Sequence, residues 1–245
     1  MGERTQHLSR RRLAATVIGF GGMAVSVVAG SSRAAAAASH QAAPAFTAPT
    51  FVKTIAKAGD AYIYPWAMAT ETVGPYAGDI VVGDYNNYVI KIFTPAGALV
   101  DTLNTRRKAL SPTVSAMGQP YGIAIDPNDG SIYVADLVKK RIDKFNDAGV
   151  FQYVITPPRG YYAPYVAVNA SGDLFITEST ITDVTGTNEI FEYSNTGSPI
   201  TTYVGVDGTN CGLGQFGNIR GIDVDSSGLL YVVDSTNRCV QVFNT

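Results

Sequence analysis

A short alternating apolar run closed by a carboxylate occurs four times along this chain. The four runs are IVVGD (80–84), IYVAD (132–136), LFITE (174–178) and LYVVD (230–234). Alternation of apolar and other residues with period two predicts half-buried β-strands. The last residues of the runs lie 52, 42 and 56 positions apart, close to the period of about 40–50 residues that is typical of radial β repeats. The pattern therefore predicts an all-β repeat protein.

The first three repeats contain three further runs of the same kind and the fourth contains two, separated by polar or glycine-containing turns. The preceding runs are PWAMA (65–69), PYGIAID (120–126), PYVAV (164–168) and IRGIDV (219–224). The following runs end in an aromatic residue: VIKIF (89–93), RIDKF (141–145), EIFEY (189–193) and VQVF (240–243). A fourth run appears as ALVDTL (98–103), VFQYVI (150–155) and PITTYV (199–204). Four short antiparallel strands per repeat predict the blades of a β-propeller.

The repeats resemble the NHL family of propeller repeats. The second repeat carries the best agreement, through GIAID (122–126), YVAD (133–136), Arg141 and Phe145. In the first and fourth repeats, Val89 and Cys239 stand where the family has arginine. The third repeat agrees least, with Glu178 in place of the aspartate and an inserted loop, STITDVTGTN (179–188). The resemblance covers residues 51–245 and implies the fold. It implies little about function, because this fold hosts binding modules, lyases and hydrolases.

The two ends of the repeat region look complementary. Its start, FVKTIA (51–56), resembles an outer strand without a blade, whereas VQVFNT (240–245) is a third strand without a fourth. Two arrangements follow. Either 51–56 pairs antiparallel with 238–243 and closes a four-bladed ring, or the four blades are part of a larger propeller, commonly six-bladed in this family.

The first 38 residues have the features of an export signal. SRRRL (9–13) precedes a moderately apolar run (14–30) and an alanine-rich stretch (34–38), the order of a signal peptide. The paired arginines favour twin-arginine export, with an ordinary secretory signal or an uncleaved anchor as alternatives. We therefore expect a signal at 1–38, a linker at 39–50 and the propeller at 51–245. The protein is expected to be secreted or on the cell surface, with no other membrane span.

Charge and histidine content exclude several functions. Residues 1–40 hold five of the 18 Lys and Arg and one of the 20 acidic residues, so 13 basic and 19 acidic residues remain, a charge near −6. Nucleic acid is not an expected partner, because its recognition needs a basic surface. The only histidines are His7 and His40, so neither a Ser-His-Asp triad nor a His-ligated zinc site can form in the repeats. We assign no catalytic residue, metal ligand or cofactor.

The carboxylates that close the runs (Asp84, Asp136, Glu178 and Asp234) admit two interpretations. We expect them to accept hydrogen bonds from backbone N–H groups of the next turn, with Arg141 pairing across its hairpin. The alternative is a ring of oxygen ligands for a hard cation. The only cysteines, Cys211 and Cys239, predict a disulfide in an exported chain; the alternative is two separate thiols.

The candidate ligand site consists of aromatic residues at the entry of the blades. One residue of each repeat directly follows the residue that opens the first strand: Trp66, Tyr121, Tyr165 and Arg220. Because these positions are equivalent, we expect the four side chains to ring one mouth of the channel, on the side of the loops holding Asp136 and Asp234. The preceding loops add Tyr62, Tyr64, Tyr161, Tyr162 and Phe216. Aromatic residues with arginine are typical of recognition surfaces, although rings could instead pack across a narrow channel.

These observations favour an exported, non-catalytic propeller that binds a protein, peptide or glycan through this mouth. The alternative is a propeller enzyme similar to gluconolactonase or a lyase, using a carboxylate-bound divalent metal; a purely structural scaffold is the third possibility. For the core, the pattern predicts that Val82, Val134, Ile176 and Val232 occupy equivalent buried positions.

Overall fold

The computed structural model describes residues 53–55, 64–105, 115–160, 162–178, 188–203 and 211–245. The predicted signal and linker lie outside the described residues. Fifteen β-strands and no α-helix are found in the described part of the chain. It follows that no helix there is long and apolar enough to cross a membrane.

The strands form four separate antiparallel sheets, each in sequence order from its inner to its outer strand. The first sheet comprises β1 (Pro65–Thr70), β2 (Ile80–Asp84), β3 (Val89–Phe93) and β4 (Leu99–Leu103). The second comprises β5 (Pro120–Ile125), β6 (Ile132–Asp136), β7 (Arg141–Phe145) and β8 (Phe151–Ile155). The third comprises β9 (Val166–Val168), β10 (Leu174–Glu178), β11 (Glu189–Tyr193) and β12 (Pro199–Tyr203). The fourth comprises β13 (Ile219–Val224), β14 (Leu229–Asp234) and β15 (Cys239–Asn244).

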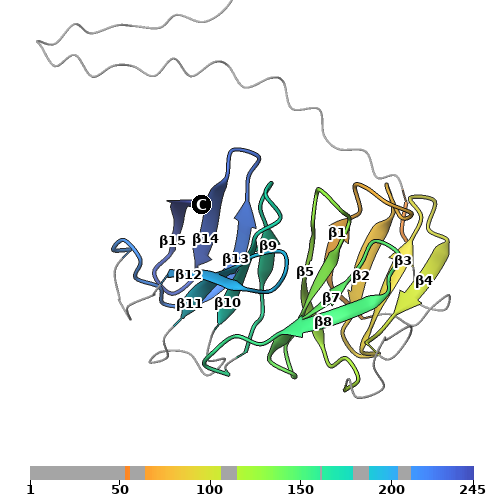
Figure 1. Cartoon of the computed structure of the whole chain (residues 1–245), viewed down its shortest axis with the longest axis horizontal. Helices are drawn as coiled ribbons and strands as arrows, with labels where there is room; N and C mark the ends of the chain where they lie inside the picture. Colours follow the sequence, from red (N-terminus) through yellow and green to blue (C-terminus); the bar gives the residue numbers. More distant parts are fainter. Residues whose placement is uncertain (1–52, 56–63, 106–114, 161, 179–187, 204–210) are drawn as a thin grey trace, which may run out of the picture. The chain divides into compact units, whose positions relative to one another are not determined.

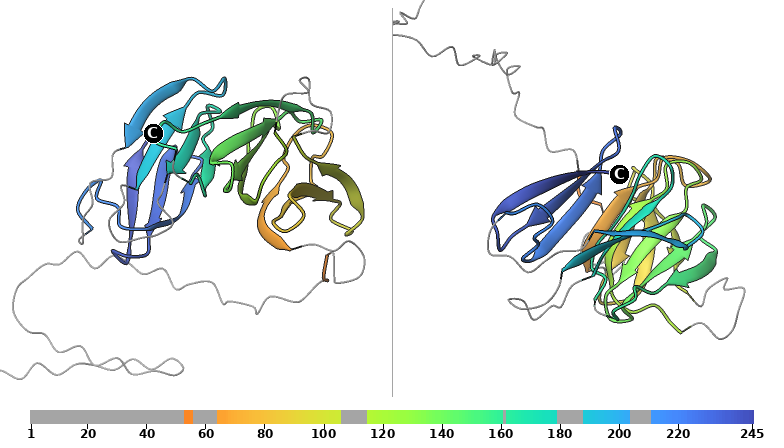
Figure 2. Two further views of the ribbon diagram at one scale, coloured as in Figure 1. Left: turned by 90° about the horizontal axis from the view of Figure 1, so that it is seen from below. Right: turned by 60° about the vertical axis from the view of Figure 1, so that its left-hand side comes forward.

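The four sheets follow one another around a common cavity, the arrangement of a four-bladed β-propeller (Figures 1 and 2), and β13 and β1 share no contact comparable to those between successive inner strands in the described residues. The inner strands β1, β5, β9 and β13 face a common cavity, and successive inner strands contact one another. The predicted all-β propeller with four recognisable blades is thus confirmed. Three blades have the four expected strands, and the fourth has three.

The register of the two innermost strands repeats between blades. Pro65 lies opposite Asp84, Pro120 opposite Asp136 and Ile219 opposite Asp234, each followed by the same irregularity. Equal registers arise because each run ends in a carboxylate at the same distance from its turn. The residue after the first position of the inner strand therefore lies beside that carboxylate in each of these blades.

Apolar side chains fill the spaces between adjacent sheets. Val134, Ile176 and Val232 are fully buried and Val82 nearly so, as predicted. Odd and even positions of a strand point to opposite faces, so one sheet contributes to two interfaces. Val134 packs toward the first sheet, whereas its neighbour Tyr133 packs toward the third.

A glycine is required where the inner strand of the second sheet meets the third. A Cβ added at Gly122 would lie 2.7 Å from the carbonyl oxygen of Pro164, a distance that real Cβ atoms do not tolerate. The glycine of the repeat pattern therefore permits the close approach of neighbouring blades.

The segment expected to close the ring is only partly described. Of 51–56, only Lys53, Thr54 and Ile55 are described; they form no strand, and Ile55 lies beside Gly97 of the first sheet. In the described chain no strand pairs with the outer edge of β15. The expected pairing of this segment with 238–243 is therefore not seen for residues 53–55.

Candidate functional site: an aromatic channel mouth

The inner strands bring aromatic side chains from three sheets to one end of the propeller. Trp66 and Tyr121 are the second residues of β1 and β5, Tyr165 directly precedes β9, and Arg220 is the second residue of β13. The register places this end on the side of Asp84, Asp136 and Asp234. We call Tyr64, Trp66, Tyr85, Tyr121 and Tyr165 together with Arg220 the aromatic mouth.

The rings of the aromatic mouth form an unbroken chain of contacts. Ring centroids are separated by 6.2 Å between Tyr64 and Trp66, 5.1 Å between Trp66 and Tyr121, and 5.7 Å between Tyr121 and Tyr165. The last pair meets edge to face, whereas Tyr64 and Trp66 are stacked. Both geometries are favourable for aromatic pairs. This series of ring contacts thus spans the first three sheets.

Arg220 extends this series of side-chain contacts to the fourth sheet. Its side chain hydrogen-bonds that of Tyr165, which also hydrogen-bonds Tyr121. Burial is the main cause that raises the pKa of Tyr165 to about 12, against the smaller opposing effect of Arg220. The Tyr165 hydroxyl therefore remains protonated at physiological pH and can serve as both donor and acceptor.

The aromatic mouth is open to solvent. Trp66 and Tyr64 are 47% and 48% exposed, Tyr85, Tyr121 and Tyr165 are partly buried, and Arg220 is exposed. A small cavity of about 70 Å³ lies between Tyr121, Tyr165 and Arg220. The arrangement offers ring faces, a small recess and a cationic donor to a ligand from outside.

Tyr85 is a member of this surface that the sequence analysis missed. Its ring centroid lies 5.0 Å from that of Trp66 and 6.1 Å from that of Tyr64. The signal was present, because Tyr85 follows Asp84 directly and the register of β2 places Asp84 opposite Pro65. Tyr85, in the turn directly after this carboxylate, therefore lies next to Trp66 near the start of the inner strand.

Other aromatic residues of the entry loops take different places. The expectation for Phe216 was wrong: it is fully buried, and its ring packs 5.8 Å from that of Phe243 in the core between the third and fourth sheets. Tyr162 lies under the ammonium group of Lys140, 5.0 Å from the ring centroid. Tyr62 and Tyr161 lie outside the described residues.

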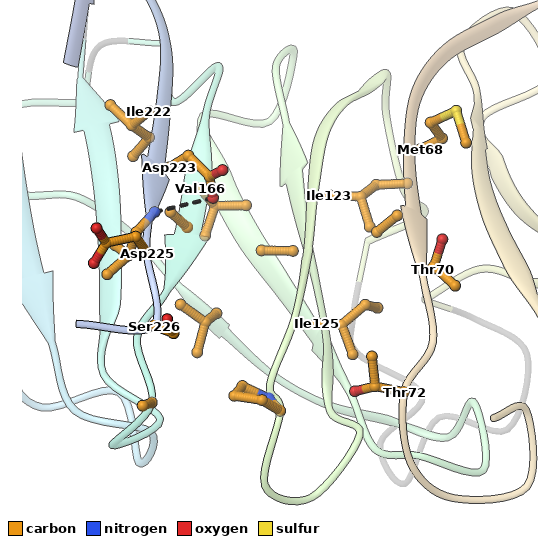
Figure 3. A pocket seen from close by; sticks show the side chains of 17 residues that line it. Met68, Thr70, Thr72, Ile123, Ile125, Val166, Ile222, Asp223, Asp225 and Ser226 are labelled. Carbon is orange, nitrogen blue, oxygen red and sulfur yellow. Dashed lines mark hydrogen bonds between the residues drawn. The ribbon is translucent and has the colours of Figure 1, made fainter. Parts of the chain in front are cut away.

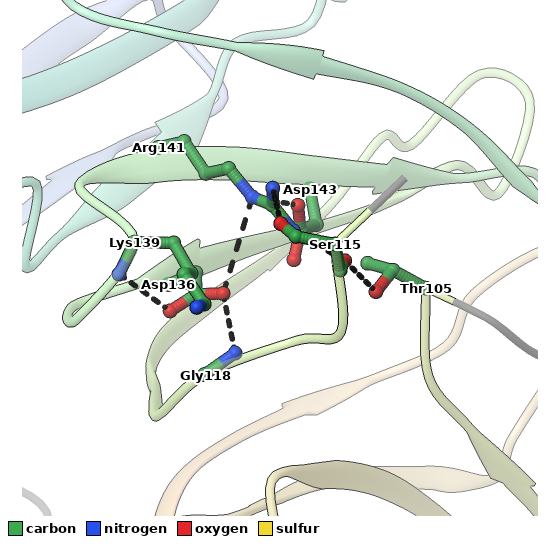
Figure 4. A network of polar contacts seen from close by, with 7 residues as sticks. All are labelled: Thr105, Ser115, Gly118, Asp136, Lys139, Arg141 and Asp143. Atoms are coloured by element: carbon green, nitrogen blue, oxygen red, sulfur yellow. Dashed lines mark hydrogen bonds and ion pairs between the residues drawn. The ribbon is translucent and has the colours of Figure 1, made fainter. Parts of the chain in front are cut away.

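The carboxylates at the ends of the second strands hold the mouth loops in place. Asp136 is buried and accepts hydrogen bonds from the N–H groups of Gly118, at 2.6 Å, and Lys139, at 3.1 Å. Gly118 belongs to the loop that enters the sheet and Lys139 to the next turn (Figure 4). The carboxylate therefore joins two segments, one more than the turn capping expected from the sequence.

Asp84 and Asp234 play the same part in the first and fourth sheets. Asp84 accepts a hydrogen bond from the backbone N–H of Tyr64 and forms an ion pair with the ammonium group of Lys91 at 2.9 Å. Asp234 accepts the N–H groups of Gly217 and Asn218 on the entry side and of Asn237 in the turn. Burial alone would raise the pKa of both carboxyls, but these hydrogen bonds outweigh it and lower the pKa.

The second sheet contains a buried charge network (Figure 4). The Arg141 guanidinium lies 2.7 Å from Asp143 and 4.0 Å from Asp136, and it donates to Ser115. Asp143 is fully buried. Its burial raises the pKa of Asp143 to about 7, despite the opposing effect of Arg141. Arg141 thus pairs across its hairpin and also fixes the loop that contains Ser115.

A central cavity lies between the inner strands of the four sheets. Its volume is about 510 Å³. Figure 3 shows apolar side chains from each inner strand pointing into it, among them Met68, Ile123, Val166 and Ile222. Thr70, Asp225 and Ser226 also line it. The cavity therefore combines apolar walls with a few polar groups.

Two further features concern ligands and covalent links. Within the described ranges, no group of three or more His, Cys, Asp or Glu residues is placed to hold a metal ion. Cys211 and Cys239 form a disulfide with a Cα–Cα distance of 6.3 Å. It ties the loop entering the fourth sheet to the first residue of β15.

Comparison with known families agrees with this architecture. The family model described as NHL repeat matches residues 216–243. This range contains β13, β14 and most of β15. The match supports the resemblance of this chain to NHL-repeat proteins, and it falls on the repeat that carries Asp234 and the disulfide.

Proposed function

We propose that this protein is an exported, non-catalytic binding module that recognises a protein, peptide or glycan through the aromatic mouth. An NHL-type propeller suggests a binding or scaffold protein. The assignment of a ligand-binding role, and of the class of ligand, depends on the aromatic mouth. Export is part of the proposal and is supported by the features of residues 1–38.

The observation that carries the proposal is the exposure of a continuous aromatic surface. Trp66 and Tyr64 remain about half exposed although their rings are in contact with each other. Contiguous exposed apolar area is unusual on a soluble protein outside interaction sites. Tyr, Trp and Arg are also the residues most enriched among those that dominate binding energy.

The mouth is also held in position before a ligand arrives. The Asp84 carboxylate binds the backbone N–H of Tyr64, and the contacts of Trp66 with Tyr85 and Tyr121 restrict its ring. Side chains that are already ordered lose little conformational entropy on binding. Flat rings and the Arg220 donor suit the apolar faces of a sugar or the side chains of a peptide.

A fluorescence experiment tests the proposal without labels. Trp66 is the only tryptophan, so its emission reports on the mouth alone. We suggest titrating the purified chain with a panel of oligosaccharides and with a library of short peptides. A ligand at the mouth should change the emission of Trp66 in a saturable way.

Variants connect the signal to the surface. Tyr121→Ala and Arg220→Gln should each weaken binding of any ligand found, by about tenfold or more for a residue worth over 1.4 kcal/mol. Tyr88→Asn is the matched control, since it removes an exposed tyrosine at the turn before β3 and asparagine tolerates the φ of 59° there. Ligands whose binding is unaffected by Tyr121→Ala and Arg220→Gln would refute the proposed site. A panel without any binder would refute these ligand classes.

A further inference from the structure

The outward face of the fourth sheet is apolar but exposed. Val233, Val240 and Val242 are 42%, 57% and 47% exposed. Val233 and Val240 are cross-strand partners, and Val242 pairs with Tyr231. These side chains therefore form one patch over β14 and β15, which we call the trailing face.

The same positions are buried in the preceding sheets. In the second sheet, Ala135 and Ile142 occupy the places of Val233 and Val240, and both are fully buried against the third sheet. In the third sheet, Thr177 and Ile190 form the equivalent pair and are likewise fully buried, with Ile190 in the core shared with the fourth sheet. A trailing face is thus the surface on which this chain packs its next blade.

A glycine gives independent support. A Cβ added at Gly122 would lie 2.7 Å from the carbonyl oxygen of Pro164, just before β9, whereas a Cβ at the corresponding Gly221 would meet nothing within 4 Å. The fourth sheet therefore keeps the residue that permits a neighbouring blade, although no blade lies there in the described structure.

The first sheet presents the complementary face. Met68 is 65% exposed, and an apolar hollow of about 320 Å³ is lined by Met68, Ile80, Val82, Phe93 and Ile55. In the second sheet, Ile123 and Val134 take the places of Met68 and Val82, and they pack on the first sheet. We call this surface of the first sheet the leading face.

We propose that two copies of this chain associate head to tail, with the trailing face of each fourth sheet packed on the leading face of the partner's first sheet. Trailing and leading faces already pack together at three junctions within the chain. Successive inner strands make these junctions, and β13 and β1 share no comparable contact in the described residues. A second copy offers both missing faces, and a two-fold axis would satisfy both junctions at once.

The test is the mass of the full chain in solution, measured by light scattering after size exclusion and by sedimentation. We expect a dimer. Val240→Glu on the trailing face and Met68→Glu on the leading face should each give folded monomers, because both residues are exposed in the single copy. Ile200→Glu, at a 52% exposed position of β12 away from both faces, should remain dimeric. Circular dichroism and thermal unfolding would verify that the variants are folded.

A mixture of the two variants distinguishes head-to-tail contact from other dimers. In a dimer formed by either variant alone, each of the two junctions would contain one glutamate. A Val240→Glu copy with a Met68→Glu copy has one junction with two glutamates and one with none. The mixture should therefore recover dimers that neither variant forms alone. A monomeric wild-type chain, a dimer unaffected by Val240→Glu, or a mixture that stays monomeric would each overturn the proposal.

Discussion

Trp66 and Tyr121 belong to neighbouring sheets, yet their ring centroids lie only 5.1 Å apart. Each is the second residue of an inner strand whose first residue lies opposite a carboxylate. The contact is therefore a consequence of equal register in two repeats. It shows how a local pattern, repeated along the chain, builds a composite surface around the channel.

A charge placed in the core should unfold the propeller. Val134 is fully buried between the first and second sheets, and an unpaired buried carboxylate costs several kcal/mol. Val134→Asp should therefore abolish the cooperative unfolding transition and make the chain sensitive to protease. Ile200→Asp, at a 52% exposed position of the outer strand β12, is the control and should remain folded. A soluble, protease-resistant Val134→Asp variant would contradict the position of this residue.

Removal of the Asp234 carboxylate should loosen the entry loop of the fourth sheet. Asp234→Ala leaves the N–H groups of Gly217, Asn218 and Asn237 without their acceptor. We expect a loss of about 2–3 kcal/mol in the free energy of unfolding, measured by urea denaturation. Asp223→Ala, an exposed carboxylate of β13, should change it little. Equal effects of the two variants would argue against the anchoring role.

Asp143 should give stability an unusual dependence on pH. Its pKa is raised to about 7 by burial, so the folded state retains a proton that the unfolded state loses near pH 4. Its contribution is complete below pH 4 and is lost as pH rises toward 7, at up to about 1.4 kcal/mol per pH unit. The unfolding free energy of wild type relative to Asp143→Asn should therefore fall over this range. A difference that stays constant between pH 4.5 and 7.5 would refute the raised pKa.

The opposite dependence is expected from Asp84. Its pKa is lowered in the folded state by hydrogen bonds from Asn87, Lys91 and Tyr64 that outweigh burial. This contribution is present above the unfolded pKa near 4 and disappears as pH falls through the lower folded value. Asp84→Asn should therefore reduce stability at neutral pH and have less effect in acid. Urea denaturation at pH 7 and at pH 3 would measure the difference.

Reduction of the disulfide should destabilise the fourth sheet. Cys211 and Cys239 are 28 residues apart in sequence, and a loop of this size corresponds to a stabilisation of about 3–4 kcal/mol. The double variant Cys211→Ala, Cys239→Ala should show this loss, and a reducing agent should reproduce it in the wild type only. Thermal unfolding with and without reductant measures both effects. An unchanged transition in the double variant would contradict the contribution of the cross-link.

Local sequence patterns were sufficient to predict the strands, their order within each blade and four recognisable blades, whereas they left the closure of the propeller open. Period-two alternation, glycine turns and closing carboxylates such as Asp136 act over a few residues, so each repeat records them locally. The burial of Val134 and the entry positions of Trp66 and Tyr121 follow from the same periodicity. The expected four-stranded blade was correct for three of the four sheets.

Tertiary structure decided which of these side chains meet and which remain uncovered. Phe216 and Tyr85 both lie in connecting segments, but one is buried in the core while the other joins the mouth. Val240 has the same local pattern as the buried Ile142, yet it is exposed because no sheet follows the fourth in the described structure. Strand periodicity assigns a side chain to a face, whereas only the packing of one sheet on the next determines whether that face is covered.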